Sequence, residues 1–316
     1  MSHYAAKGGT MQTKHYPWQI LSGSTLKILA VITMLIDHMG ASILERASSH
    51  PNGLAGGVRA LQTKLPFLAG LITDGQRLMD IDWKMRMIGR LAFPIYCFLL
   101  VEGIKYTHSK LKYLTRLLIF ALVSEIPFDF CFEGKLFEWS HQNVFWTMAL
   151  AVGAMWVLEY TQENCRTYIP IAGTEDVKGD ERPGVMTPAQ VEGYEKEAAG
   201  ARHLKPVGYT ARGLFFRFAA VILAVVLGFV LRTDYNGVGV ACILCLYVLR
   251  EKQILECVFG ALVFWFMESF LTVPLAFVPV LFYGGKRGLK MKYFFYAFYP
   301  VHLLLLGLFV RFYLGY

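Results

Sequence analysis

The stretch Leu26-Lys-Ile-Leu-Ala-Val-Ile-Thr-Met-Leu-Ile-Asp37-His38-Met-Gly40 decides the fold class of this chain. It is a run of apolar residues of the kind that crosses a bilayer in about 20 residues. It nevertheless carries a carboxyl group and an imidazole side by side, well inside the run. Ionisable groups at such a depth are costly and by default indicate function. We therefore expect a membrane protein whose chemistry lies within its spans.

The composition of the whole chain agrees with this expectation. Of its 316 residues, 55% are hydrophobic and only 17% are charged, and the mean hydropathy is +0.43. These values exclude an ordinary water-soluble globule. Lys and Arg number 31 against 23 Asp and Glu. In so apolar a chain the excess indicates loops on the inner side of a membrane rather than a nucleic-acid surface, so no nucleic-acid partner is expected.

The cysteines indicate neither a disulfide scaffold nor a metal site. Five of the six cysteines lie in or beside apolar runs, where cysteine packs as a small hydrophobic residue. Cys242 and Cys245 have the spacing of a metal knuckle, but their flanking residues supply no further ligands. We expect no bound metal.

Nine apolar stretches predict an all-α polytopic membrane protein, a bundle of about nine transmembrane helices with proline-broken helices and one polar cytoplasmic insertion. Because the sixth to eighth are short, the count could range from eight to ten. The stretches are 26–44, 87–104, 112–131, 143–160, 213–232, 237–249, 254–267, 270–284 and 293–314. The predicted parts are a cytoplasmic N-terminal segment (1–25), a membrane half with the polar residues (26–160), a polar cytoplasmic linker or small cap (161–212) and a second membrane half (213–316).

The positive charges predict an orientation in an inner or plasma membrane. Lys and Arg gather in alternate connections, which places the N-terminus in the cytoplasm and, with nine spans, the C-terminus outside. One segment disagrees: residues 45–86 should lie outside, yet they hold six basic residues.

Six polar side chains within or at the ends of the spans form the candidate site. Asp37 and His38 project about 100° apart around their helix, so each needs a partner on another helix. Pro94 leaves the backbone carbonyl of Arg90 without its helical donor, so Arg90 brings its charge to a locally opened helix. Arg90 is therefore the natural counter-ion for Asp37. The helical rise places Glu125 near the level of His38. The remaining two are Asn143, at the start of the fourth span, and His302, which follows Pro300.

Five ordered blocks resemble the TraX family of membrane proteins, known from conjugation systems for the N-terminal acetylation of pilin. They cover residues 26–147, and the closing motif Tyr299-Pro300-Val301-His302-Leu303 resembles that of the family more weakly. The segment 161–212 departs from the pattern. The blocks are Leu26-Lys27 with Ile36-Asp37-His38-Met39-Gly40; Ile88 to Ile95 with Glu102-Gly103; Tyr113 with Arg116-Leu117; Ser124-Glu125-Ile126-Pro127-Phe128-Asp129; and Asn143-Val144-Phe145 with Thr147.

The resemblance implies an integral membrane acyltransferase that moves an acetyl group from acetyl-CoA to an amine or hydroxyl acceptor, on a peptide N-terminus or a glycan. The basic loop that follows Gly284 is a candidate contact for the phosphates of this CoA thioester. Its cations are Lys286, Arg287, Lys290 and Lys292.

In this hypothesis His38 is the general base and His302 is the alternative base, because an imidazole titrates near neutral pH. Arg90 or Asn143 would stabilise the oxyanion. Asp37 would hold Arg90, and Glu125 would orient the histidine or bind an amine. Two other functions are compatible with the sequence: a proton-coupled small-molecule transporter, and a non-enzymatic membrane assembly protein whose charges only fix helix register.

Overall fold

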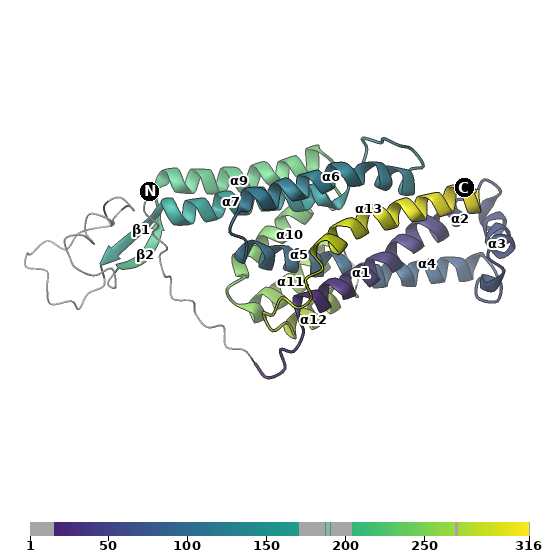
Figure 1. Cartoon of the computed structure of the whole chain (residues 1–316), viewed down its shortest axis with the longest axis horizontal. Coiled ribbons are helices and arrows are strands. Elements are labelled where there is room, and N and C mark those ends of the chain that lie inside the picture. Colours follow the sequence, from purple (N-terminus) through teal and green to yellow (C-terminus); the bar gives the residue numbers. More distant parts are fainter. Residues whose placement is uncertain (1–15, 171–186, 188–189, 191–203, 269–270, 316) are drawn as a thin grey trace, which may run out of the picture. The chain divides into compact units, whose positions relative to one another are not determined.

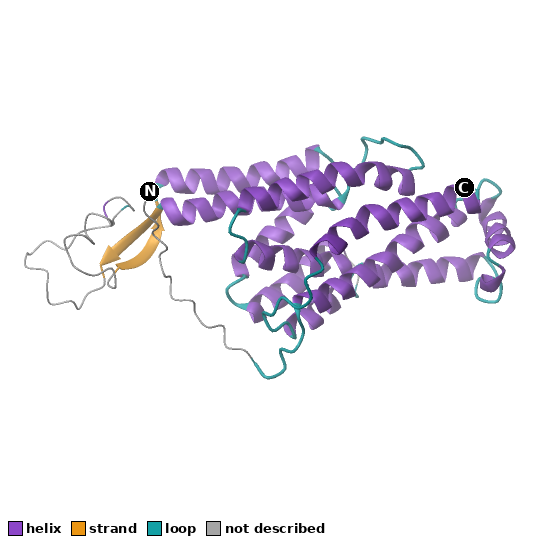
Figure 2. Cartoon of the chain, viewed as in Figure 1, coloured by secondary structure: helices purple, strands orange, loops and turns teal. Residues whose placement is uncertain are grey.

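The computed structural model describes residues 16–170, 187, 190, 204–268 and 271–315. Most of the predicted N-terminal segment and the middle of the segment 161–212 lie outside these residues. The described part is mostly helical, with one pair of strands (Figure 2). The chain divides into two compact units. Unit 1 holds Met1–Leu99, Glu251–His302 and Leu308–Tyr316, and unit 2 holds Leu100–Arg250 and Leu303–Gly307.

Unit 1 is built around α1 (Gly23–Met39), which continues through a π-helical turn, η1 (Gly40–Leu44), into α2 (Glu45–Ser48). α1 packs against α4 (Gly75–Gly89) on one side, and α13 (Lys292–Leu308) lies along another (Figure 1). The other elements of this unit are α3 (Gly53–Lys64), η2 (Pro66–Leu68), α11 (Gln253–Glu268), η4 (Val273–Ala276), α12 (Phe277–Leu281) and η5 (Phe309–Leu314).

Unit 2 is a group of four packed helices. α7 (Val144–Asn164) contacts α6 (Lys110–Phe132), α9 (Ala211–Val230) and α10 (Asn236–Leu249), and α9 also packs on α10. Gly228 and Gly237 bring α9 and α10 into close approach, since a Cβ on Gly228 would lie 2.7 Å from the Gly237 Cα. α5 (Ala92–Lys105) has residues in both units.

The prediction of an all-α chain is wrong in one detail. β1 (Arg166–Pro170) and β2 (Leu204–Tyr209) pair antiparallel, with an irregularity between Thr167 and Tyr168. The β-branched and aromatic residues of β1 suit a strand. They lie inside the segment 161–212, whose polar composition indicated only a linker or small cap.

Five helices of the described part are long and apolar enough to cross a membrane, which supports a multi-pass membrane protein. They are Gly23–Ser48, Gly75–Lys105, Val144–Asn164, Ala211–Val230 and Tyr293–Leu314. The other four predicted spans are also helical but are shorter or more polar. The stretch 112–131 forms α6, which carries five charged residues. The stretches 237–249 and 254–267 form the short helices α10 and α11, and the described residues of 270–284 form only η4 and α12. Nine spans therefore stay a prediction.

The second span begins twelve residues earlier than predicted. α4 starts at Gly75, where the Asp74 carboxylate caps the helix by accepting a hydrogen bond from the Arg77 amide at 2.9 Å. The helix is interrupted at Arg90 and Leu91, which form a turn between α4 and α5 shortly before Pro94. Elsewhere, α6 and α13 continue through Pro127 and Pro300.

Candidate functional site

Asp37 and His38 of α1 each contact a residue of another helix of unit 1, as predicted. The Asp37 carboxylate lies 2.7 Å from the Arg86 guanidinium of α4. His38 Nδ1 lies 2.7 Å from His302 Nε2 of α13. The 100° step between neighbouring helical residues is what sends the two side chains to different neighbours.

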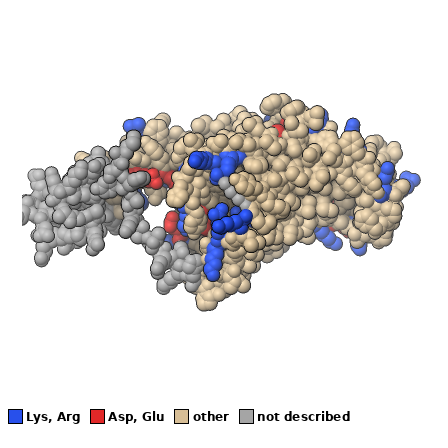
Figure 3. Space-filling model, in the orientation of Figure 1, with Lys and Arg blue, Asp and Glu red and all other residues tan. Residues whose placement is uncertain are grey.

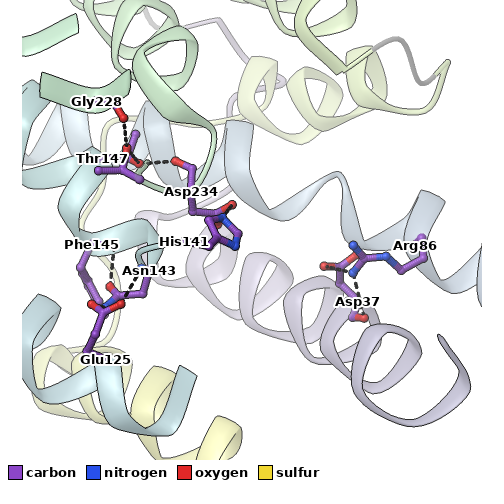
Figure 4. A network of polar contacts seen from close by, with 10 residues as sticks. Asp37, Arg86, Glu125, His141, Asn143, Phe145, Thr147, Gly228 and Asp234 are labelled. Carbon is purple, nitrogen blue, oxygen red and sulfur yellow. Dashed lines mark hydrogen bonds and ion pairs between the residues drawn. The ribbon is translucent and has the colours of Figure 1, made fainter. Parts of the chain in front are cut away.

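Arg86 holds Asp37 at two points, as Figure 4 shows. Its Nη1 contacts the Asp37 side chain and also donates to the Asp37 backbone oxygen at 3.3 Å. Both side chains are largely buried, with 16% of Asp37 and 24% of Arg86 exposed. The attraction between two charges is stronger in such a low-dielectric environment, but loss of either residue would leave the other charge buried without compensation.

Gly89 makes room for this carboxylate. A Cβ on Gly89 would lie 2.1 Å from Asp37 Oδ1, which no side chain tolerates. Gly89 is buried at the last position of α4. Helix α4 therefore approaches α1 closely because this position has no side chain.

We expect Gly89→Ala to displace Asp37 and to destabilise the protein by about 1–3 kcal/mol, the usual cost of overpacking. Thermal unfolding in detergent measures it. The matched control is Gly153→Ala in α7, where a Cβ would meet nothing within 4 Å. That change should be neutral or stabilising by up to about 1 kcal/mol, because alanine favours helix. Equal melting temperatures for the two variants would contradict the close approach.

The two histidines form a directional chain of hydrogen bonds. His302 is 5% exposed, and its Nδ1 lies 2.6 Å from the Phe298 carbonyl oxygen. Since a carbonyl oxygen only accepts, His302 Nδ1 carries the proton. In the neutral ring, Nε2 is then the acceptor and His38 Nδ1 must donate to it. This assignment puts the lone pair of a neutral His38 on Nε2, which makes that atom the basic nitrogen of the pair.

Aromatic rings fix the orientation of this pair. The two imidazole planes differ by 3°, with centroids 5.0 Å apart. The Phe298 ring stacks on His302 at 4.6 Å, and the Tyr299 ring lies edge-on to both imidazoles. Such packing limits rotation of the imidazoles, as general-base catalysis requires.

Arg90 has an ion-pair partner that the sequence did not predict. Its Nε lies 3.3 Å from Glu268 at the end of α11, and only 6% of the Glu268 side chain is exposed. The nearby Thr272 hydroxyl donates to the Met87 carbonyl oxygen at 2.9 Å. Asp37 was the expected partner of Arg90, but the cation that contacts Asp37 at 2.7 Å is Arg86.

Glu125 and Asn143 belong to unit 2 and contact each other there (Figure 4). The Asn143 side chain caps α7 by accepting from the Phe145 amide at 3.1 Å, and it donates to Glu125 and to the Ala121 carbonyl oxygen. Glu125 also accepts from the Trp146 indole at 2.8 Å. Both amide hydrogens of Asn143 are therefore engaged by Glu125 and Ala121, and its amide oxygen caps the start of α7.

A second polar contact in unit 2 joins the loop before α7 to the α9–α10 connection. His141 Nε2 lies 3.5 Å from Asp234 Oδ1, and the Thr147 hydroxyl donates to the Asp234 backbone oxygen (Figure 4). The hydrogen bond with Asp234 raises the pKa of His141 above its ordinary value of 6.5, although burial opposes the shift.

This shift predicts a pH-dependent contribution to stability. Because the pKa of His141 is higher in the folded state, the contribution is fully present below the unfolded value and is lost as the pH rises through the folded one. The side chain is 46% exposed, so we expect only about 0.2–1 kcal/mol. Comparison of wild type with His141→Gln in thermal unfolding should show a difference at pH 5.5 that shrinks by pH 8.5. A constant difference would contradict the pairing.

The predicted basic loop is part of unit 1 and closes over the start of α1. The amides of Gly23 and Ser24 donate to the carbonyl oxygens of Lys286 and Arg287, at 2.8 and 3.1 Å. The side chains of Lys286, Arg287 and Lys290 are exposed, and Lys292 is the first residue of α13. The helix N-terminus is therefore capped by this loop, and the side chains of Lys286, Arg287 and Lys290 remain at the surface.

The structure thus divides the predicted site between the two units. Four residues, Asp37, His38, Arg90 and His302, lie in unit 1, and Glu125 and Asn143 lie in unit 2. Three residues near these groups were not predicted from the sequence: Arg86, Glu268 and Asp82, whose Oδ1 is buried near Gly40. For Asp82 and Arg86 the available sequence signal was helical spacing, because they recur with Gly89 at intervals of four and three residues; Glu268 had no such signal. Among the described residues, no group of three or more His, Cys, Asp or Glu is arranged to hold a metal ion.

Comparison with known proteins agrees with the resemblance. A probable fimbrial assembly protein FimC of serogroup H1 from Dichelobacter nodosus is 27% identical over 265 residues, which are 78% of this chain and 93% of that protein. No solved structure matches the chain. The family model described as TraX protein matches residues 22–178 and 201–310. The match extends into both ends of the segment 161–212, so only residues 179–200 between the two matched parts depart from the family pattern, fewer than predicted. The chain therefore belongs to the TraX family.

Proposed function

We propose that this protein is a membrane acyltransferase that moves an acetyl group from acetyl-CoA to an amine or hydroxyl acceptor. The observation that carries the proposal is the His38–His302 pair, because an imidazole whose second nitrogen is hydrogen-bonded is a common form of enzymatic base. The residues of unit 1 around this pair supply the other groups that acyl transfer needs.

His38 acts as the general base in this mechanism. Its Nε2 takes the proton from the acceptor nitrogen or oxygen, which attacks the thioester carbonyl carbon. The resulting oxyanion is stabilised by a cation of unit 1, Arg86 or Arg90. As the carbon–sulfur bond breaks, the His38 imidazolium returns its proton to the leaving thiolate. His302 keeps His38 in the required tautomer through the chain that ends at the Phe298 carbonyl oxygen.

The relative from Dichelobacter nodosus supports an acceptor in fimbrial assembly. It is named a probable fimbrial assembly protein, and the family resemblance implies acetylation at the pilin N-terminus. We therefore propose the N-terminal amine of a pilin-like peptide as the acceptor, with a glycan hydroxyl as the alternative. With the N-terminus in the cytoplasm, the start of α1 faces the side on which acetyl-CoA is made.

A non-enzymatic role in assembly is the second candidate. The ion pairs Asp37–Arg86 and Arg90–Glu268 are also what helix registration requires, and the name of the relative mentions assembly alone. A proton-coupled transporter is a weaker third candidate, since buried carboxylates and histidines also build proton relays.

The decisive experiment uses the full-length protein purified in detergent. Mass spectrometry of the native protein tests for bound CoA, and radiolabelled acetyl-CoA is offered with peptides whose N-terminus is free or blocked. Label transfer to the free amine alone supports the proposal. A folded protein that neither retains CoA nor transfers label overturns it in favour of assembly, and uptake into vesicles without acetyl-CoA would favour transport.

A further inference from the structure

Two cations at the start of α1 lie together without an acidic partner. Lys27 is half-buried, with its ammonium 5.5 Å from the centroid of the Phe295 ring. Arg287 is held at the same end of the helix, because its carbonyl oxygen accepts a hydrogen bond from the amide of Ser24, three residues before Lys27, at 3.1 Å. Among the described residues, neither cation forms an ion pair. Two cations at the same helix end repel each other, and an anion bound by both would relieve this repulsion.

The loop conformation holds Arg287 beside the helix. Gly285 and Gly288 have φ angles of 68° and 72°, in the left-handed region that glycine favours. Ser24 Oγ accepts from the Leu289 amide at 3.0 Å, and a Cβ on Gly288 would lie 2.1 Å from that oxygen. The helix amides are engaged by the loop, so an anion here would be bound by the side chains of Lys27 and Arg287.

Lys27 and the His38–His302 pair lie on the same faces of α1 and α13 in unit 1. Lys27 and His38 are eleven residues apart on α1, which is three turns, so they share a face about 16 Å apart along the axis. Their partners on α13, Phe295 and His302, are two turns apart and also share a face. We name the strip between them, lined by Lys27, Phe295, Phe298, His302 and His38, the α1–α13 seam.

We propose that Lys27 and Arg287 bind the phosphates of the thioester donor, whose arm follows the α1–α13 seam to His38. The inference rests on the proposed function and adds Lys27 to the predicted donor contacts. Three backbone bonds of an extended chain span 3.3–3.6 Å, so an arm of about 13 bonds between phosphate and sulfur reaches about 15 Å. That reach matches the distance of about 16 Å between Lys27 and His38 along the axis of α1.

The charge pattern favours this location. Lys286 and Lys290 add two exposed cations to the same loop, and neither forms an ion pair in the described part of the chain. On the face shown in Figure 3, Lys and Arg stand in small groups on a surface that is mostly uncharged. A phosphodiester of an anionic lipid headgroup has the same chemistry as the donor phosphates, so the experiment must separate the two.

The test compares two donors, acetyl-CoA and S-acetylpantetheine, which lacks the phosphates. With Lys27→Ala, we expect the KM for acetyl-CoA to rise about 10- to 100-fold, as for the loss of a charged hydrogen bond. The KM and kcat for S-acetylpantetheine should not change, and Lys27→Arg should restore most of the acetyl-CoA affinity. The control is Lys84→Ala, an exposed lysine of α4, which should leave both donors unaffected.

The outcomes separate this inference from the proposed function. If the wild type uses neither donor, the acyltransferase proposal fails. If it uses both and Lys27→Ala leaves the acetyl-CoA KM unchanged, only this inference is overturned. Equal losses with both donors would indicate a structural lysine and would also overturn it. In nanodiscs, a variant that loses phosphatidylglycerol binding while keeping its CoA affinity would assign the cations to lipid instead.

Discussion

Replacing His38 with alanine is expected to reduce kcat for acetyl transfer by about 10²- to 10⁴-fold, the usual contribution of a positioned general base. The loss follows from the hydrogen-bond directions, which put the basic lone pair on His38 Nε2. His302→Ala should retain more activity, because His302 positions His38 and does not itself touch the acceptor. Its pH–rate profile should shift, since His38 would then lack the acceptor for its Nδ1 proton.

The assay measures initial rates with saturating acetyl-CoA and a peptide acceptor. His108→Ala is the matched control, because this histidine is exposed in the loop between α5 and α6. All three variants should elute as folded protein and unfold cooperatively in detergent, which separates lost chemistry from lost folding. Full turnover by His38→Ala would remove His38 from the mechanism. A greater loss in His302→Ala than in His38→Ala would reverse the two roles.

The largest expected change in stability is that of Arg86→Met. It removes the cation 2.7 Å from a carboxylate that is only 16% exposed. Breaking a buried pair from one side typically costs about 3–5 kcal/mol, because the remaining charge keeps its desolvation penalty. Adding Asp37→Asn to Arg86→Met should recover much of this loss, since the neutral amide needs no counter-ion.

Thermal or denaturant unfolding in detergent measures both variants. Lys135→Met is the matched control: it breaks the Lys135–Glu138 pair, whose lysine is 62% exposed, and should cost less than about 1 kcal/mol. If the double variant were no more stable than Arg86→Met, the charge of Asp37 would not be the cause of the loss.

Much of the candidate site was predictable from single residues. Asp37, His38 and His302 stand out because each interrupts an apolar run, and the 100° helical step correctly predicted that Asp37 and His38 each need a partner on another helix. Their partners were harder to identify. Arg86 lies in residues 45–86, which the predicted order of spans made an external connection, whereas the structure makes it the fourth residue from the end of α4, a helix packed on α1.

The prediction for Asn143 shows the same limit. Its position at the start of a span suggested an oxyanion contact, but the backbone there leaves the Phe145 amide needing an acceptor, and the Asn143 side chain supplies it. A polar residue at the edge of an apolar run serves as a cap or as a functional group depending on contacts that only the folded chain creates.

The sequence by itself determined the helical class, the membrane character and the residues that carry charge into apolar segments, because burial preference and helical periodicity are local properties of the chain. The tertiary structure alone decided that Asp37 meets Arg86, that Arg90 meets Glu268 and that His38 meets His302. Such pairings join residues 49 to 264 positions apart. They depend on which helices pack together and at what height, and these are set by close approaches such as that of Gly89, which no local pattern encodes.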